Sequence, residues 1–276
     1  MLRLAVRVRR AEADIVLAEL LELAPSGVEE VDIDAATVEF AVYGPPGEVP
    51  ELGALQAIAG GALVEVTTSE IADDWHERWR EFHRPLILGG RLTVRPPWEL
   101  AAATELDIVI DPGRAFGTGA HATTRLCLEL LLELPAGPSA VDLGCGSGVL
   151  GITAARLGFG SVLALDYDPL SVEATIANAS VNGVSARVKA RRFDVRSEPV
   201  PAAPLVLANL LGPLLRDWVA AMLAGVGSVP GGVIASGLLV EEADGISAAF
   251  SQLGMRECRR RTRGEWSALL MHKVHD

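Results

Sequence analysis

The fold of this chain is decided by the stretch Val141-Asp142-Leu143-Gly144-Cys145-Gly146-Ser147-Gly148-Val149. An apolar start, an acid and three glycines at alternate positions predict a strand that stops, turns tightly and enters a helix. Glycine suits such a turn because it accepts a positive φ angle and lets a ligand lie against the backbone. The amides at the start of the helix then face outward with partial positive charge. The stretch therefore predicts the ligand-binding turn of a parallel α/β sheet.

A second apolar strand follows, Ser161-Val162-Leu163-Ala164-Leu165-Asp166, and it ends in a carboxylate. Nucleotide-binding α/β folds place an acid about 20 residues after the glycine turn, where it accepts hydrogen bonds from ribose hydroxyls. Together the glycine turn and Asp166 predict an adenosine pocket.

The glycine spacing distinguishes between adenosine compounds. A dinucleotide fingerprint reads G-x-G-x-x-G, whereas here the third glycine is Gly148 and Val149 follows it. The GK[ST] of a P-loop does not follow either. The pattern D-x-G-x-G-x-G with a strand-end acid resembles motifs I and II of class I S-adenosylmethionine-dependent methyltransferases. NAD(P) binding and a glycine-rich turn without a ligand remain as alternatives.

Composition and charge limit the class of protein and of partner. The chain of 276 residues is long enough for two domains. It is 50% hydrophobic and 22% charged, with a mean hydropathy of +0.31, which indicates a globular protein. A net charge of −12 opposes free binding to nucleic acid and attracts a basic partner, although ordinary solubility would explain it too. The cysteines, Cys127, Cys145 and Cys258, lie far apart, so we expect no disulfide framework and no metal site.

No targeting or membrane segment is expected. Residues Met1 to Arg10 alternate apolar and basic residues, which indicates a strand and not a signal peptide. The uncharged stretch from Trp218 to Val240 is interrupted by Gly227-Ser228 and Pro230-Gly231-Gly232, so neither part is long enough to span a bilayer. We therefore expect a cytoplasmic protein without membrane contact.

Residues 1–69 predict a small α+β domain without His or Cys. The order of its elements is βαββαβ, which is typical of a ferredoxin-like fold that binds or packs and does not catalyse. The predicted strands and helices are Leu2–Arg9, Ala11–Leu23, Val28–Asp34, Thr37–Tyr43, Pro50–Ile58 and Leu63–Thr68. Residues 70–85 predict a helical linker between domains, because Trp75, Trp79 and Phe82 share one helix face.

Residues 86–276 predict alternating strands and helices closed by an antiparallel hairpin, which is the seven-stranded methyltransferase sheet. The loop from Asp111 to Arg125 is rich in Gly and Thr, as binding loops are, although a plain capped helix start would explain it as well. The buried strand Leu205–Leu211 carries Asn209 near its carboxyl end, where ligands of such sheets bind. We therefore expect Asn209 to point at the transferred methyl group.

The motifs together resemble the bacterial methyltransferases of large-subunit ribosomal protein L-eleven (PrmA), which belong to class I. The residues that carry the resemblance are Asp111-Pro112-Gly113-x-Ala115-Phe116-Gly117-Thr118-Gly119-x-His121-x-Thr123-Thr124, Asp142-Leu143-Gly144-x-Gly146-Ser147-Gly148-Val149-Leu150, Ala208-Asn209-Leu210-Leu211, Ser236-Gly237-Leu238-Leu239 and Gly264-Glu265-Trp266. The resemblance covers nearly the whole chain, with its specific motifs in the catalytic half.

The resemblance implies a domain of residues 1–69 that recognises the substrate and a domain of residues 86–276 that transfers methyl groups to lysine side chains and to the N-terminal amine of that ribosomal protein. S-adenosylmethionine is the expected donor and S-adenosylhomocysteine the product. We expect cofactor contacts from Thr124, Gly144, Gly146, Asp166, Asn209, Gly117 and Asp142, and catalytic roles for Asn209, Phe116 and Thr118.

The expected partner is the ribosomal protein, free or on the ribosome, with no direct contact to nucleic acid, and we expect a monomer. Three alternatives stay open. In the first, the same catalytic half methylates another protein or a small molecule. In the second, the chain is a binding module that holds the cofactor without turnover. In the third, it is a dehydrogenase.

Overall fold

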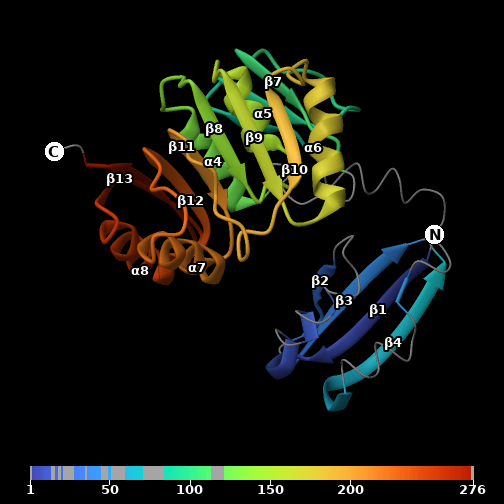
Figure 1. Ribbon diagram of the computed structural model, residues 1–276. Coiled ribbons are helices and arrows are strands. Elements are labelled where there is room, and N and C mark those ends of the chain that lie inside the picture. The colour runs from blue at the N-terminus through green and yellow to red at the C-terminus, as the bar shows by residue number, and fades with distance from the viewer. Residues whose placement is uncertain are drawn as a thin grey trace. The chain divides into compact units, whose positions relative to one another are not determined.

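The computed structural model describes residues 2–13, 16–17, 20, 28–34, 36–44, 49–50, 60–70, 84–112 and 121–274. The chain divides into two compact units, Met1–Phe82 and His83–Asp276, and each is described by itself (Figure 1). The predicted helical linker 70–85 lies outside the described residues except at its ends.

The first unit is built on a four-stranded antiparallel sheet in the order β2-β3-β1-β4 (Figure 1). Its strands are β1 (Leu2–Arg9), β2 (Glu29–Asp32), β3 (Thr37–Gly44) and β4 (Leu63–Glu70), with short 3₁₀ turns at Arg10–Glu12 and Gly60–Ala62. In this order β3 lies between β1 and β2, which is the split arrangement of the predicted ferredoxin-like fold. The helices predicted over 11–23 and 50–58 lie largely outside the described residues.

Apolar side chains at every second position of β1 and β3 build the core of this unit. Leu4, Val6 and Val8 point to one face of the sheet and pack with Val38 and Phe40 from the neighbouring strand. A period of two places every second side chain on the same face, so the intervening polar residues lie on the other face, where Arg3 and Arg7 pair with Glu39.

A seven-stranded sheet in the order β10-β9-β8-β11-β12-β14-β13 forms the centre of the second unit (Figure 1). The strands are β8 (Ser139–Leu143), β9 (Ser161–Asp166), β10 (Val188–Arg192), β11 (Leu205–Asn209), β12 (Gly232–Leu239), β13 (Met255–Arg263) and β14 (Trp266–Lys273). The first five pair in parallel, and β14 runs antiparallel to β12 and β13. This arrangement confirms the predicted methyltransferase sheet.

Helices cover both faces of this sheet. The helices are α4 (Ala122–Leu131), α5 (Val149–Arg156), α6 (Pro169–Val181), α7 (Gly212–Leu223) and α8 (Val240–Ser251). Apolar residues of α4 and α5 share one core with the sheet, and those of α7 and α8 share the other. In the second core the rings of Trp218 and Phe250 meet edge to face with centroids 5.9 Å apart. The central strands β8, β11 and β12 are therefore buried on both faces, as their near-continuous apolar sequences require.

A small sheet of β5 (Leu86–Leu88), β6 (Leu92–Arg95) and β7 (Leu106–Val109) precedes α4. A turn at Gly89-Gly90 joins β5 to β6, and these glycines have positive φ angles of 53° and 69°. Arg95 donates two hydrogen bonds to Asp107, at 2.8 and 2.7 Å, across the parallel pair β6 and β7.

Two boundaries near the carboxyl ends of the strands have a local cause. Strand β12 continues to Leu239, because a bulge at Gly237, with φ 83°, absorbs a register shift and lets pairing with β14 resume. Helix α4 starts at Ala122, because His121 caps it.

Candidate functional site

The predicted site residues that the structure describes gather at the carboxyl ends of β8, β9 and β11. The strand order reverses at β8, since β9 and β10 lie on one side of it and β11 and β12 on the other. Ligands of open parallel sheets bind in the crevice at such a reversal. Asp166 ends β9 and Asn209 ends β11, so both reach this crevice edge.

The glycine turn takes the tight form that its sequence predicts. Gly144, Gly146 and Gly148 have φ angles of 73°, 52° and 81°, a region that side chains disfavour. A Cβ atom at Gly144 would lie 2.4 Å from Leu210 Cδ2, and one at Gly148 would lie 2.8 Å from Thr175 Cγ2. The turn is therefore closely packed against its neighbours as well as strained for any other residue.

Asp166 joins the end of β9 to the glycine turn. Its Oδ2 accepts the Gly146 N–H at 2.9 Å, and its Oδ1 accepts the Asp168 N–H at 3.0 Å. Burial raises the pKa of this carboxyl above its usual range, although the two amides act against the rise. A carboxylate has about four acceptor positions. Two positions are thus left for hydroxyls of a bound ribose.

Asp142 lies beneath the glycine turn, not at its surface. The side chain is completely buried, and its Oδ2 accepts the Gly151 N–H at 2.7 Å in the first turn of α5. Its Oδ1 has no hydrogen-bond partner among the described residues. Burial raises the pKa of this carboxyl to about 7. In this geometry Asp142 supports the helix start, and the contact with cofactor expected of it stays a prediction.

A polar stripe on α6 contributes residues that the sequence analysis missed. Ser171, Thr175, Asn178 and Asn182 are all buried, at spacings of four, three and four residues. Thr175 Oγ1 donates to the Gly146 carbonyl at 3.0 Å, and Asn178 Nδ2 donates to the Ser147 carbonyl at 2.9 Å. The helical spacing of these polar side chains in an otherwise apolar helix is the signal that would have identified them.

The same stripe reaches the end of β7. Asn178 Oδ1 accepts the Asp111 N–H at 3.0 Å, and Asn182 Oδ1 accepts the Val109 N–H at 2.9 Å. Asn178 therefore holds the glycine turn with one side-chain atom and the entrance of the 111–125 loop with the other. The two stretches singled out in the sequence are joined by α6.

The start of α4 is attached to β11 and β12. Asn209 Nδ2 donates to Thr124 Oγ1 at 3.3 Å, and Ser236 Oγ donates to the Thr123 carbonyl at 3.3 Å. His121 caps the helix through Nδ1, which accepts the Thr123 N–H at 3.3 Å, and burial lowers the pKa of its ring. The structure thus brings Thr124 and Asn209 together. Three further predicted residues, Phe116, Gly117 and Thr118, lie outside the described residues.

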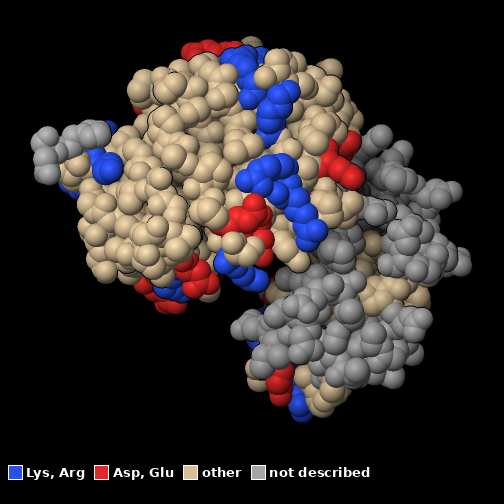
Figure 2. All heavy atoms as spheres, in the orientation of Figure 1, with Lys and Arg blue, Asp and Glu red and all other residues tan. Residues whose placement is uncertain are grey.

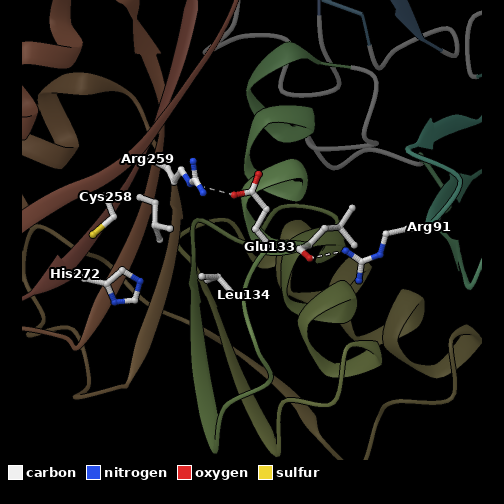
Figure 3. A pocket seen from close by; sticks show the side chains of 8 residues that line it. Arg91, Glu133, Leu134, Cys258, Arg259 and His272 are labelled. Atoms are coloured by element: carbon white, nitrogen blue, oxygen red, sulfur yellow. Dashed lines mark hydrogen bonds and ion pairs between the residues drawn. The ribbon is translucent and has the colours of Figure 1, made fainter.

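A shallow hollow lies at the opposite end of the sheet (Figure 3). It is lined by Arg91, Leu132, Glu133, Leu134, Cys258, Arg259, Leu270 and His272. His272 pairs with Gly232 at the start of β12, whereas the predicted site is at the strands' carboxyl ends. The hollow is therefore separate from the predicted site.

The described part of the chain contains neither a cluster of metal ligands nor a helix that could span a membrane. Within it, no three His, Cys, Asp or Glu side chains are grouped to hold a metal ion. No helix in that part has both the length and the apolar character needed to cross a bilayer.

Comparison with known proteins places this site in a family. The family model described as ribosomal protein L11 methyltransferase (PrmA) matches residues 51–274. The ribosomal protein L11 methyltransferase of Pelotomaculum thermopropionicum is 40% identical over 225 residues, covering 79% of this chain and 72% of the relative. That of Syntrophotalea carbinolica is 37% identical over 306 aligned positions, covering 97% and 96%.

A solved structure agrees with these relatives. The crystal structure of ribosomal protein L11 methylase from Lactobacillus delbrueckii subsp. bulgaricus is similar with a TM-score of 0.62 at 27% identity. The match covers 70% of this chain and 100% of that one. The family model and the two relatives span most of the chain, and the chain therefore belongs to the ribosomal protein L11 methyltransferase family.

Proposed function

We propose that this protein transfers methyl groups from S-adenosylmethionine to amino groups of ribosomal protein L11, on lysine side chains and at the N-terminal amine. The observation that carries the proposal is the glycine turn held to Asp166 at the strand-order reversal, in a chain that matches the L11 methyltransferase family over residues 51–274.

The residues of the crevice suit this cofactor. Asp166 keeps acceptor positions for the two ribose hydroxyls, and Gly146 has no side chain that would keep a ligand away from the backbone. Thr124 and Asn209 would bind beyond the ribose, toward the reacting group. Bound S-adenosylmethionine supplies an electrophilic methyl group on a sulfonium centre.

The orientation of the Asn209 side chain determines which of its atoms can hydrogen-bond to an amine. Its Nδ2 donates to Thr124 Oγ1, so its Oδ1 points elsewhere and is available to accept an amine N–H. Such a bond would aim the nitrogen lone pair at the methyl group, and alignment of this kind supplies much of an enzyme's acceleration. Phe116 and Thr118 would shape the entrance for the amine, and Gly117 would contact the cofactor.

The amine must be neutral when it attacks. A free lysine has a pKa of about 10.4, so presenting it neutral near pH 7 costs about 4 to 5 kcal/mol. Removal of water from around the lysine lowers that pKa and reduces the cost. With S-adenosylmethionine bound, the neutral amine would attack the methyl group in line, the bond from carbon to sulfur would break, and a proton would leave the nitrogen for solvent.

The first unit would recognise the protein substrate, free or on the ribosome. Its sheet follows the ferredoxin-like order, and the net charge of −12 of the whole chain favours a basic partner. In this proposal the protein acts as a monomer in the cytoplasm.

The test is mass spectrometry of purified ribosomal protein L11 after incubation with this protein and S-adenosylmethionine, with Asp166→Ala as the control. We expect mass gains of one methylene group each, absent with the variant, on peptides that contain lysine or the N-terminus. Cofactor binding without any gain would move the search to another protein or to a small molecule. Failure to bind the cofactor would refute the proposal.

A further inference from the structure

One edge of the seven-stranded sheet carries a concentrated positive charge. Residues 187–196 contain five cations in a chain whose net charge is −12. We call Arg187, Lys189, Arg191, Arg192 and Arg196 the β10 strip. Strand β10 is the last of its sheet, so one side of its backbone is unpaired. In Figure 2 the Lys and Arg side chains form a band over the place that β10 occupies in Figure 1.

Most of this charge is not neutralised. Of the five cations of the β10 strip, Arg191 alone forms an ion pair with another described residue, Glu198, at 3.2 Å. Lys189 donates to the Ser185 carbonyl and Arg192 to the Tyr167 carbonyl, so both keep their full charge. The other nearby acid, Asp194, accepts the backbone N–H of Arg196. The strip therefore presents positive charge to solvent.

The opposite edge strand provides a contrast, because it is equally rich in arginine. Of the five arginines of β13, Arg259 and Arg261 pair with Glu133 of the segment after α4, and Arg260 pairs with Glu257 and Asp244. Figure 3 shows the first of these pairs beside the hollow. Three of the five arginines of β13 thus hold elements of this protein together through ion pairs, whereas among the described residues Arg191 is the one cation of the β10 strip in an ion pair.

The carboxyl end of the strip also carries an aromatic platform. Tyr167 is 62% exposed, and the guanidinium carbon of Arg192 lies 4.8 Å from its ring centroid. Arg192 pairs in register with Asp166, the acid expected to bind the cofactor ribose. RNA-binding surfaces combine these two features: cations along the backbone bind the phosphates, and an exposed aromatic ring stacks on a base.

We infer that the β10 strip binds the phosphate backbone of RNA and that Tyr167 stacks on one of its bases. The inference rests on the proposed function for the source of that RNA, because a ribosomal protein substrate is carried by ribosomal RNA. It replaces the expectation of no direct nucleic-acid contact, which followed from net charge alone. Net charge averages over the surface, whereas phosphates respond to the local field of the strip.

Protection of the sheet edge is the competing explanation, since charged side chains on an edge strand prevent pairing with other chains. The two explanations differ in the sign of the charge that they require. Glutamate protects an edge as well as lysine does, but it repels phosphate.

The experiment uses the full chain with Lys189→Glu and Arg196→Glu together. Both side chains are exposed, neither forms an ion pair among the described residues, and neither belongs to the proposed catalytic site. Arg256→Glu with Arg263→Glu on β13 is the matched control, because it changes net charge by the same amount. Binding of a fluorescein-labelled RNA hairpin is followed by fluorescence anisotropy over a series of KCl concentrations.

We expect the unmodified protein to bind the hairpin, and the β10 variant to bind it about tenfold or more weakly at low salt. Loss of two phosphate contacts should flatten the slope of log K against log salt by about 1.4 to 1.8. The β13 variant should bind nearly as the unmodified protein does. Methylation of free ribosomal protein L11 should proceed equally with all three proteins, so a failure of the proposed function would be seen separately.

Three results would overturn the inference. The first is absence of RNA binding by the unmodified protein. The second is equal loss with the β10 and β13 variants, which would show that only total charge matters. The third is tighter binding to poly-glutamate than to RNA, which would assign the strip to an acidic protein. Lys189→Gln with Arg196→Gln, which removes charge without reversing it, serves if the reversed variant does not fold.

Discussion

Asp142 provides the sharpest test of the site geometry, through the pH dependence of stability. Its carboxyl is completely buried under the glycine turn. Burial raises its pKa from an ordinary 3.8 to about 7, with the Gly151 amide opposing the rise and the charge of Asp166 adding to it. The prediction concerns Asp142→Asn, which keeps an acceptor for the Gly151 N–H but does not ionise.

The direction follows from linkage between proton binding and folding. Below about pH 4 the carboxyl is protonated in both the folded and the unfolded chain, and its contribution to stability is fully present. As the pH rises, the unfolded chain ionises first, so stability is lost progressively until about pH 7. The loss amounts to at most about 4 kcal/mol, since each tenfold difference in proton affinity is worth about 1.4 kcal/mol.

Asp142→Asn should remove this loss. The amide nitrogen takes the place of Oδ1, which has no partner among the described residues, so one unsatisfied buried atom replaces another. We expect similar free energies of unfolding for both proteins near pH 4.5, and a variant more stable by a few kcal/mol at pH 8. Urea denaturation with equal m-values at both pH values is the measurement.

The control is Asp217→Asn on the exposed side of α7, which should follow the pH profile of the unmodified protein. Parallel stability curves for Asp142→Asn and the unmodified protein between pH 4.5 and 8 would refute the reasoning. Such a result would mean that the Asp142 carboxylate is already stabilised as an anion in the folded chain.

Other substitutions test the remaining parts of the site. Asp166→Ala should weaken S-adenosylmethionine binding about 100-fold or more, because two hydrogen bonds to a charged acceptor are lost; calorimetry showing unchanged affinity would contradict its assignment to the ribose. Asn209→Ala should lower the single-turnover methylation rate about 100-fold while changing cofactor affinity much less, and the reverse pattern would make Asn209 a cofactor ligand only. Gly148→Ala should cost about 2 to 4 kcal/mol of unfolding free energy, because φ is 81° and the new Cβ would meet Thr175 at 2.8 Å. Adding Thr175→Ser, which removes Cγ2 but keeps the hydroxyl that donates to the Gly146 carbonyl, should return only part of the steric cost. Full stability of the single variant in urea denaturation would show that the turn can relax.

The sequence by itself determined the elements whose causes are local. The glycine turn needs positive φ at Gly144, Gly146 and Gly148, and alternate glycines after an apolar run have few other uses. The strand-end position of Asp166 follows from the apolar run before it and the Asp168-Pro169 helix start after it. Periodicity and turn chemistry act over a few residues, so these features are readable without a structure.

Contacts between distant residues were decided only by the tertiary structure. Asn209 and Thr124 meet although they are 85 residues apart, and Asn178 joins the glycine turn to Asp111 although 67 residues separate Asn178 from that acid. Asp142 reads as a site acid in the sequence, yet the packing of α5 buries it completely. The β10 strip is visible as charge in the sequence, but which of its cations form ion pairs depends on the elements that lie beside it. Local patterns specify each element, whereas burial and pairing depend on the packing of elements far apart in the chain.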